Sequence, residues 1–98
     1  MFKLFYVYML ASRSRVLYIG ITGNLENRLA WHRSGTNPKC FTARYRVTKL
    51  VYLEEYTDAR QAIDRETQIK KWRRSKKVRL IEAGNPEWDD LAPPAQQG

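Results

Sequence analysis

The chain has 98 residues, which suffices for one domain and excludes two independent hydrophobic cores. Lysine and arginine number 18 against 10 aspartates and glutamates, so the formal charge is +8. A chain this small and basic is expected to bind a polyanion, with nucleic acid favoured over an anionic membrane surface. The sequence holds no run of about 18 apolar residues, which excludes a transmembrane helix. Cys40 is the single cysteine, which excludes an intrachain disulfide and a cysteine-based zinc site and favours a reducing, cytoplasmic location.

The first third of the chain predicts a β-hairpin followed by a helix. Aromatic and β-branched residues over 4–11 and 16–21 are typical of strands, and the polar turn at 12–15 makes the pair antiparallel. Both alternating faces of the first strand are apolar, which indicates a central strand covered on both sides. Asn24 is a suitable N-cap for a helix that runs to about Ser34.

The remainder predicts a basic loop, one more strand and two helices. The loop spans 36–46 and the third strand 47–55. A helical period extends over 58–74, and a second short helix over 76–83 is capped by Ser75. The order β-β-α-β-α-α predicts an α+β fold, with helices flanking a three-stranded antiparallel sheet.

We expect one domain over residues 1–91. The last segment, 92–98, carries two prolines and two glutamines and is predicted to be a frayed tail.

Glu66 stands at the centre of the apolar face of the long predicted helix. At about 100° per residue, that face also carries Ala59, Ala62, Ile63 and Ile69. A half-buried carboxylate is uncommon unless it is paired or binds a metal. Two interpretations follow: a structural ion pair with an arginine, or a metal ligand or acid–base group.

Polar and aromatic side chains also gather on the first three elements. Arg28 and His32 are four residues apart and share one helix face. His32 is the only histidine; a lone histidine is commonly structural, but an arginine one turn earlier favours a functional role. Tyr18 and Gly20 share one face of the second strand, and a glycine inside a strand often marks the close approach of a ligand or another backbone. Core packing is the ordinary alternative for strand tyrosines such as Tyr8.

Half of the cationic residues, nine of 18, lie between positions 60 and 79, with Trp72 among them. Such a cluster can hold a phosphate backbone while its aromatic ring stacks on an exposed base; a solvated helix face is the alternative. The residues expected to contact nucleic acid come from this cluster and from the basic loop: Lys39, Arg44, Arg46, Lys70, Lys71, Arg73, Arg74, Lys76 and Lys77.

Taken together, these motifs resemble the GIY-YIG endonuclease superfamily. The first strand carries Tyr6-Val7-Tyr8 where the family has Gly-Ile-Tyr, and the second carries an intact Tyr18-Ile19-Gly20. The pair Arg28 and His32 matches the family's arginine and its histidine or tyrosine one turn later, and Glu66 falls where the family has its metal-binding glutamate. The resemblance covers about residues 4–83. It is closest to the small, single-domain bacterial branch called UPF0213 or excinuclease-subunit-C N-terminal-like.

The resemblance implies a metal-dependent endonuclease that hydrolyses phosphodiester bonds, with DNA as the expected substrate and little sequence specificity. One Mg²⁺ (or Mn²⁺) is expected to be held by Glu66 and waters. Arg28 would clamp the scissile phosphate. Tyr8 would be the general base or would position the attacking water, with Tyr18 as its partner at the phosphate. His32 would orient Tyr8 or relay its proton.

A non-catalytic nucleic-acid-binding module that retains the fold is the alternative function. Ile21 stands where many relatives carry lysine, and residues 78–81 lack the asparagine that commonly follows the glutamate; Asn85 is the nearest. These departures favour the alternative, whereas the intact catalytic set favours the enzyme. The sequence leaves the oligomeric state open, with a monomer favoured.

Overall fold

A three-stranded antiparallel sheet organises the chain in the computed structural model, which describes residues 3–34 and 39–93. The elements in order are β1 (Phe5–Ala11), β2 (Leu17–Thr22), α1 (Leu25–Ser34), α2 (Phe41–Arg44), β3 (Lys49–Tyr56), α3 (Ala59–Lys70) and α4 (Arg74–Gly84). The predicted α+β class and element order are confirmed, with the short α2 as an addition. No helix in the described residues is long and apolar enough to cross a bilayer.

β1 is the central strand, as predicted, because the sheet order is β2-β1-β3. In the β1–β2 hairpin, Tyr8 is opposite Gly20 and Leu10 is opposite Tyr18. Directly opposed residues in an antiparallel pair lie on the same face of the sheet. The register therefore places the tyrosines of both motif strands on one face, with Gly20 between them.

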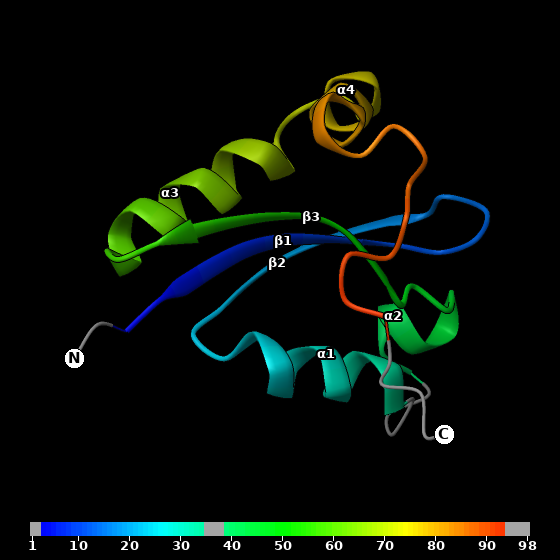
Figure 1. Ribbon diagram of the computed structural model, residues 1–98, viewed down its shortest axis with the longest axis horizontal. Helices are drawn as coiled ribbons and strands as arrows, with labels where there is room; N and C mark the ends of the chain where they lie inside the picture. Colours follow the sequence, from blue (N-terminus) through cyan, green and yellow to red (C-terminus); the bar gives the residue numbers. More distant parts are fainter. Residues whose placement is uncertain (1–2, 35–38, 94–98) are drawn as a thin grey trace.

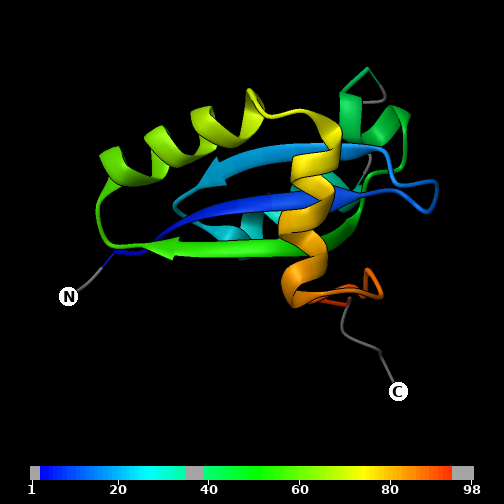
Figure 2. The same ribbon diagram turned by 90° about the horizontal axis from the view of Figure 1, so that it is seen from above.

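Helices cover both faces of the sheet (Figure 1), which explains why β1 is apolar throughout. On the face covered by α3 and α4, Val7, Met9 and Ala11 belong to one buried cluster, called here the upper cluster. On the face covered by α1, Tyr8 and Leu10 belong to a second, called here the lower cluster. Viewed from above, α3 runs beside the edge strand β2 and α4 crosses the sheet (Figure 2).

α3 ends at Lys70 rather than near Arg74 as the sequence predicts. The two amides that follow bond three residues back, as in a closing 3₁₀ turn, and Trp72 then packs against the upper cluster. Burial of Trp72 and the run of like charges after Lys70 both oppose a continuous helix. α4 begins at Arg74 with Arg73 as its N-cap, so the predicted Ser75 cap is wrong.

The short helix α2 was not predicted; the sequence indicates an irregular loop over 36–46, of which 35–38 lie outside the described residues. Thr42 is buried within this turn, and its carbonyl accepts a hydrogen bond from the Val47 amide at 2.9 Å. One helical turn is too short for hydrophobic periodicity to show in the sequence.

The segment after α4 passes from the upper to the lower face. The Asn85 amide donates to the Val51 carbonyl of β3 at 3.1 Å, and the Leu91 amide donates to the Leu50 carbonyl at 2.7 Å. Ala92, expected in a frayed tail, packs against the lower cluster, while residues 94–98 of that tail lie outside the described residues. Asn85, the asparagine nearest to the position expected from the family resemblance, therefore has a structural role.

Asp90 joins this segment to α1 and β3. Its carboxylate accepts hydrogen bonds from the Arg33 guanidinium at 3.1 Å and from the Leu50 amide at 3.1 Å. The Arg33 and Asp90 side chains are each 20% exposed, so the pair is shielded from most of the solvent. This interaction holds α1 against the sheet, and neither Arg33 nor Asp90 belongs to the motifs identified in the sequence.

Replacing Asp90 by alanine is expected to lower the free energy of unfolding by about 2–3 kcal/mol, because the Arg33 guanidinium and the Leu50 amide lose a charged acceptor. Urea denaturation measures this loss. Asp89→Ala is the matched control, since the Asp89 side chain is exposed and makes no hydrogen bond in the described residues. Equal losses in the two variants would contradict this role of Asp90.

Candidate active site

Tyr8 lies directly over Gly20. A Cβ atom built on Gly20 would meet the Tyr8 hydroxyl oxygen at 2.4 Å and the ring carbon bearing it at 2.5 Å. Real Cβ atoms do not approach other atoms this closely, so only glycine leaves room for the phenol. The close approach predicted at Gly20 is therefore made by a side chain of the neighbouring strand rather than by a ligand or a backbone.

On the α1 side, the Tyr8 phenol is hydrogen-bonded to His32. The Tyr8 hydroxyl and His32 Nε2 are 2.9 Å apart in a buried hydrogen bond. The other ring nitrogen, Nδ1, is 2.9 Å from the Thr42 hydroxyl of α2. Both nitrogens of the imidazole thus have a partner, and three elements far apart in the sequence meet in the chain Tyr8–His32–Thr42.

Burial governs the ionisation of the hydrogen-bonded side chains of Tyr8 and His32. Burial and the Arg28 guanidinium lower the pKa of His32 to about 4, so the imidazole is neutral at pH 7. Burial, followed by the neighbouring Tyr18, raises the pKa of Tyr8 well above its usual range. Arg28 opposes this effect on the Tyr8 pKa and the Glu66 carboxylate adds to it. The Tyr8 phenol is therefore protonated near neutrality.

Tyr18 packs beside the same pair. Its ring centroid lies 5.0 Å from that of His32 and 6.3 Å from that of Tyr8. The His32 ring also has an edge contact with Trp31, at 5.1 Å. Tyr8 is therefore buried, and its hydroxyl is hydrogen-bonded to His32. Tyr18 is half-buried and lies at the boundary with solvent.

Arg28 is exposed one turn before His32, as the spacing predicts. Its guanidinium stacks on the Trp31 ring at 5.4 Å. Among the described residues it has no hydrogen-bond or ion-pair partner. Its positive charge nevertheless lowers the pKa of both Tyr8 and His32. An accessible guanidinium without a protein partner can bind an anion.

Glu66 extends from α3 with a side chain that is only 15% exposed. Its ion-pair partner is Lys70, at 3.5 Å on the next turn, and not an arginine. The adjacent Arg65 pairs instead with Glu54 of β3, at 3.0 Å. The structural alternative for Glu66, an ion pair with an arginine, is therefore wrong in its partner, since the ion pair is made with Lys70. No hydrogen bond links Glu66 to Tyr8 in the described part of the chain, but its charge reaches the Tyr8 hydroxyl.

A metal site here would depend on one protein carboxylate. No group of three or more His, Cys, Asp or Glu side chains is placed to hold a metal ion in residues 3–34 and 39–93. Mg²⁺ binds oxygen ligands and commonly keeps several waters, with one or two carboxylates and substrate phosphates completing its shell. A single half-buried carboxylate such as Glu66 fits that ion, and fits no cation that requires a closed cage of protein ligands.

The predicted nucleic-acid contacts fall on two sides of the sheet. Lys39, Arg44 and Arg46 flank α2 on the lower side, whereas the end of α3 and the start of α4 carry the others on the upper side (Figure 1): Lys70, Lys71, Arg73, Arg74, Lys76 and Lys77. The two segments that carry these groups, α2 and the junction of α3 and α4, lie at the β2 side of the sheet (Figure 2). Two of the upper cations already have partners, since Arg74 donates to the Arg15 carbonyl at 2.7 Å and Lys70 pairs with Glu66.

Residues 4–79 match a known family model, the GIY-YIG catalytic domain. The chain belongs to the GIY-YIG family. Among curated relatives, a UPF0213 protein of Syntrophus aciditrophicus is 43% identical over 82 residues, covering 84% of this chain and 93% of that protein. A UPF0213 protein of Clostridium perfringens is 43% identical over 76 residues, covering 78% of this chain and 81% of that protein. This GIY-YIG domain is therefore of the small UPF0213 type.

The fold of this GIY-YIG domain is also similar to a solved structure. The solution NMR structure of a UPF0213 protein from Bacillus halodurans aligns with a TM-score of 0.59 at 22% sequence identity. The alignment covers 96% of this chain and 99% of that one. At that identity the likeness concerns the fold alone, and it agrees with the element order found here.

Thr42 is the site residue that sequence reasoning missed. It fixes one nitrogen of His32 from a helix that lies ten residues further along the chain. The available signal was weak: a hydroxyl residue between an aromatic residue and a basic one, in a segment interpreted as a loop. Phe41 and Tyr45, on the same helix, were missed for the same reason.

Gly20→Ala is expected to displace the Tyr8 phenol and to lower the free energy of unfolding by roughly 1–3 kcal/mol, because the added methyl group overlaps the ring. Gly84→Ala is the control, since a Cβ at Gly84 meets nothing within 4 Å. Thermal melting should therefore separate the two variants. An unchanged melting temperature and an unchanged Tyr8 environment in Gly20→Ala would contradict the contact.

Acid is expected to destabilise this GIY-YIG domain through His32. The pKa of His32 is about 4 when folded and 6.5 when unfolded, so its contribution is complete above pH 6.5 and is lost as the pH falls toward 4. The loss should reach about 2 kcal/mol by pH 5, still above the range in which most carboxylates titrate. Urea denaturation between pH 7 and pH 5 measures it. His32→Gln should lack this slope, and an equal slope in both proteins would assign the effect elsewhere.

Proposed function

We propose that this protein is a metal-dependent endonuclease that hydrolyses DNA phosphodiester bonds with little sequence specificity. The observation that supports it most is the buried Tyr8 phenol, which is hydrogen-bonded to His32 at 2.9 Å and is influenced by the exposed Arg28 guanidinium and the half-buried Glu66 carboxylate. Phosphodiester hydrolysis needs an anion clamp, an oriented water and neutralisation of developing charge, and these groups match those needs.

Arg28 binds the scissile phosphate through its forked donors, which have no protein partner among the described residues. Glu66 would hold one Mg²⁺ or Mn²⁺, with waters and a phosphate oxygen completing the shell. When bound, such an ion neutralises charge on the phosphate and lowers the pKa of a coordinated water. Lys70, which pairs with Glu66 across one turn at 3.5 Å, helps to orient that carboxylate.

Tyr8 orients the attacking water rather than deprotonating it. Its raised pKa makes the phenol a poor base at neutral pH, whereas a fixed hydroxyl oxygen is a good acceptor for a water hydrogen. In this role the Tyr8 hydroxyl donates its own proton to His32 Nε2, and His32 Nδ1–H donates to Thr42. The phenol oxygen is then left with its lone pairs free for the water. The Tyr18 ring packs beside Tyr8 and His32 on the side nearer the solvent.

A non-catalytic DNA-binding module is the second candidate, favoured by two observations. Ile21, at the position where many relatives carry lysine, packs against the upper cluster, and Asn85 is committed to hydrogen bonds with the backbone of residues 51 and 89. Neither residue is available to a substrate. The two candidates differ in one measurable property, which is cleavage in the presence of a divalent ion.

Glu66→Gln tests the proposal. The variant keeps the size of the side chain but removes its charge, so it should fold, still bind DNA, and lose Mg²⁺-dependent cleavage by roughly two or more orders of magnitude. Cleavage of a labelled oligonucleotide with Mg²⁺ and with a chelator gives the rate, and thermal melting of the same preparation gives the stability.

Asp64→Asn is the matched control, because Asp64 is a carboxylate on the same helix with a side chain that is 65% exposed. It should cleave at the wild-type rate. Cleavage per folded molecule that is unchanged in Glu66→Gln would refute the metal-binding role. A wild-type protein that binds DNA but shows no metal-dependent cleavage would establish the non-catalytic candidate instead.

A further inference from the structure

α2 presents two aromatic rings to solvent. Phe41 and Tyr45 are 43% and 45% exposed, although large aromatic side chains are ordinarily well buried. They lie one helical turn apart, with ring centroids at 4.9 Å, and form one continuous surface. We call this pair the α2 shelf. Core packing does not account for it, because the residue of α2 that enters the interior is Thr42.

The α2 shelf is continuous with the candidate active site. The Phe41 ring lies 6.3 Å from Tyr18, which in turn lies 5.0 Å from His32. Thr42, between the two shelf residues, carries the hydrogen bond to His32 Nδ1. The same helical turn therefore fixes the catalytic imidazole on its inner side and exposes the aromatic pair on its outer side.

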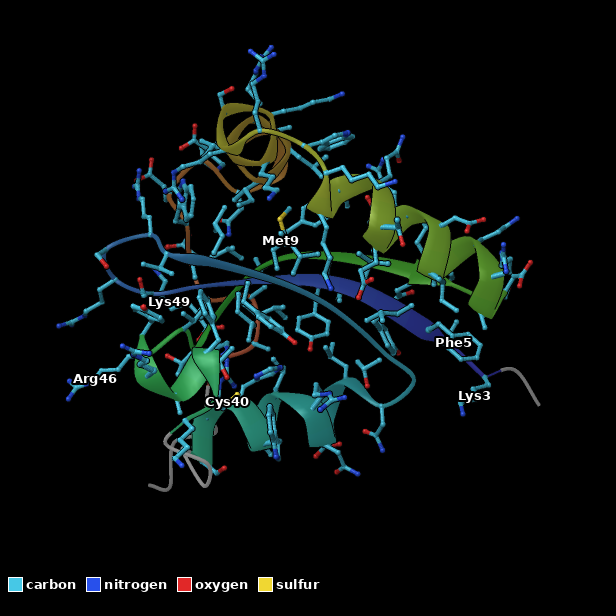
Figure 3. All side chains as sticks on the ribbon, turned by 180° about the vertical axis from the view of Figure 1, so that it is seen from behind. Lys3, Phe5, Met9, Cys40, Arg46 and Lys49 are labelled. Carbon is cyan, nitrogen blue, oxygen red and sulfur yellow. The ribbon has the colours of Figure 1, made fainter. Side chains whose placement is uncertain are left out.

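The surroundings of the α2 shelf are cationic. No residue from 27 to 53 is Asp or Glu, whereas six residues in that stretch are Lys or Arg. Arg44 lies over the Tyr45 ring at 5.6 Å. Arg46 is exposed and projects away from the molecule beside α2, while Cys40 lies where α2 meets α1 (Figure 3). An apolar aromatic surface in a purely basic setting complements a ligand with flat rings and negative charge.

Nucleic acid with unpaired bases has this chemistry, whereas a duplex does not offer it. Bases within a duplex stack on one another and present only phosphates and groove edges, but an unpaired base offers its face to an aromatic side chain. The aromatic residue of the upper basic cluster is less suited to this role, because Trp72 is half-buried against the upper cluster and two cations, Arg65 and Lys76, lie over its ring.

We propose that the α2 shelf is a stacking subsite for unpaired nucleobases next to the scissile phosphate, so that the preferred substrate contains single-stranded nucleotides. This inference rests on the proposed function for the position of the phosphate. Phe41 and Tyr45 supply the stacking surface, and Arg44 and Arg46 supply contacts to the flanking phosphates.

The test is a binding measurement without divalent ions, which separates it from catalysis. Fluorescence anisotropy of the full chain is measured with a labelled single-stranded oligonucleotide and with the same sequence as a blunt duplex. The double variant Phe41→Ala/Tyr45→Ala should weaken binding to the single strand by roughly tenfold or more, and should change duplex binding by less than about twofold. Phe41→Tyr/Tyr45→Phe, which keeps both rings, should retain wild-type binding. Ile63→Ala, which alters an exposed apolar residue on α3, should also have no effect.

Three results would overturn the proposal. Unchanged single-strand binding in the alanine variant would show that the α2 shelf does not contact bases. Equal weakening on single strand and duplex, with an unchanged melting temperature, would indicate a general contact with nucleic acid that does not depend on unpaired bases. A dimer that the alanine variant dissociates, seen by analytical ultracentrifugation, would make a second copy the occupant. If the melting temperature of the double variant is well below that of the wild type, the binding test uses Tyr45→Ala alone. Loss of cleavage in Glu66→Gln without any effect of the α2 shelf on single-strand binding would show that this inference alone failed. Unchanged cleavage in Glu66→Gln with the shelf effect intact would show that the proposed function alone failed.

Discussion

The buried hydrogen bond between the Tyr8 hydroxyl and His32 joins the sheet to the lower helices and orients the candidate site. It forms only because Gly20 has no Cβ, so that the phenol can cross β2, and because Thr42 occupies the far nitrogen of the imidazole. Every buried side-chain polar atom in the described residues has a hydrogen-bond partner. The low pKa of His32 follows from the same burial and keeps the link uncharged.

Electrostatics around this bond divide the candidate site into a positive and a negative side. Arg28 lies on the α1 side and Glu66 on the α3 side, and their effects on the Tyr8 pKa are opposite in sign. A phosphate bound between them would meet the guanidinium directly, whereas the carboxylate would repel it unless a divalent cation intervened. The proposed metal dependence would therefore rest on a single carboxylate in a chain of net charge +8.

Much of the fold and several site positions could be predicted from the sequence because their signals are local. The apolar faces of β1, the cap at Asn24 and the four-residue spacing of Arg28 and His32 all depend on neighbouring residues. Thr42 could not be found, because a single turn has no periodicity and its partner lies ten residues away. The Asp90 contacts span 40 and 57 residues, and the end of α3 depends on where Trp72 packs. Such long-range contacts are decided by the assembled core.

The protonation of His32 tests the account most directly, and a single histidine makes the measurement unambiguous. The ¹⁵N chemical shifts of the two ring nitrogens, followed by NMR from pH 8 to pH 4, report both the tautomer and the pKa. The account predicts one neutral tautomer at pH 7, with the proton on Nδ1, and no protonation until the pH approaches 4. A mixture of tautomers that titrates near pH 6.5 would show that His32 is not held between Tyr8 and Thr42, and would contradict the account.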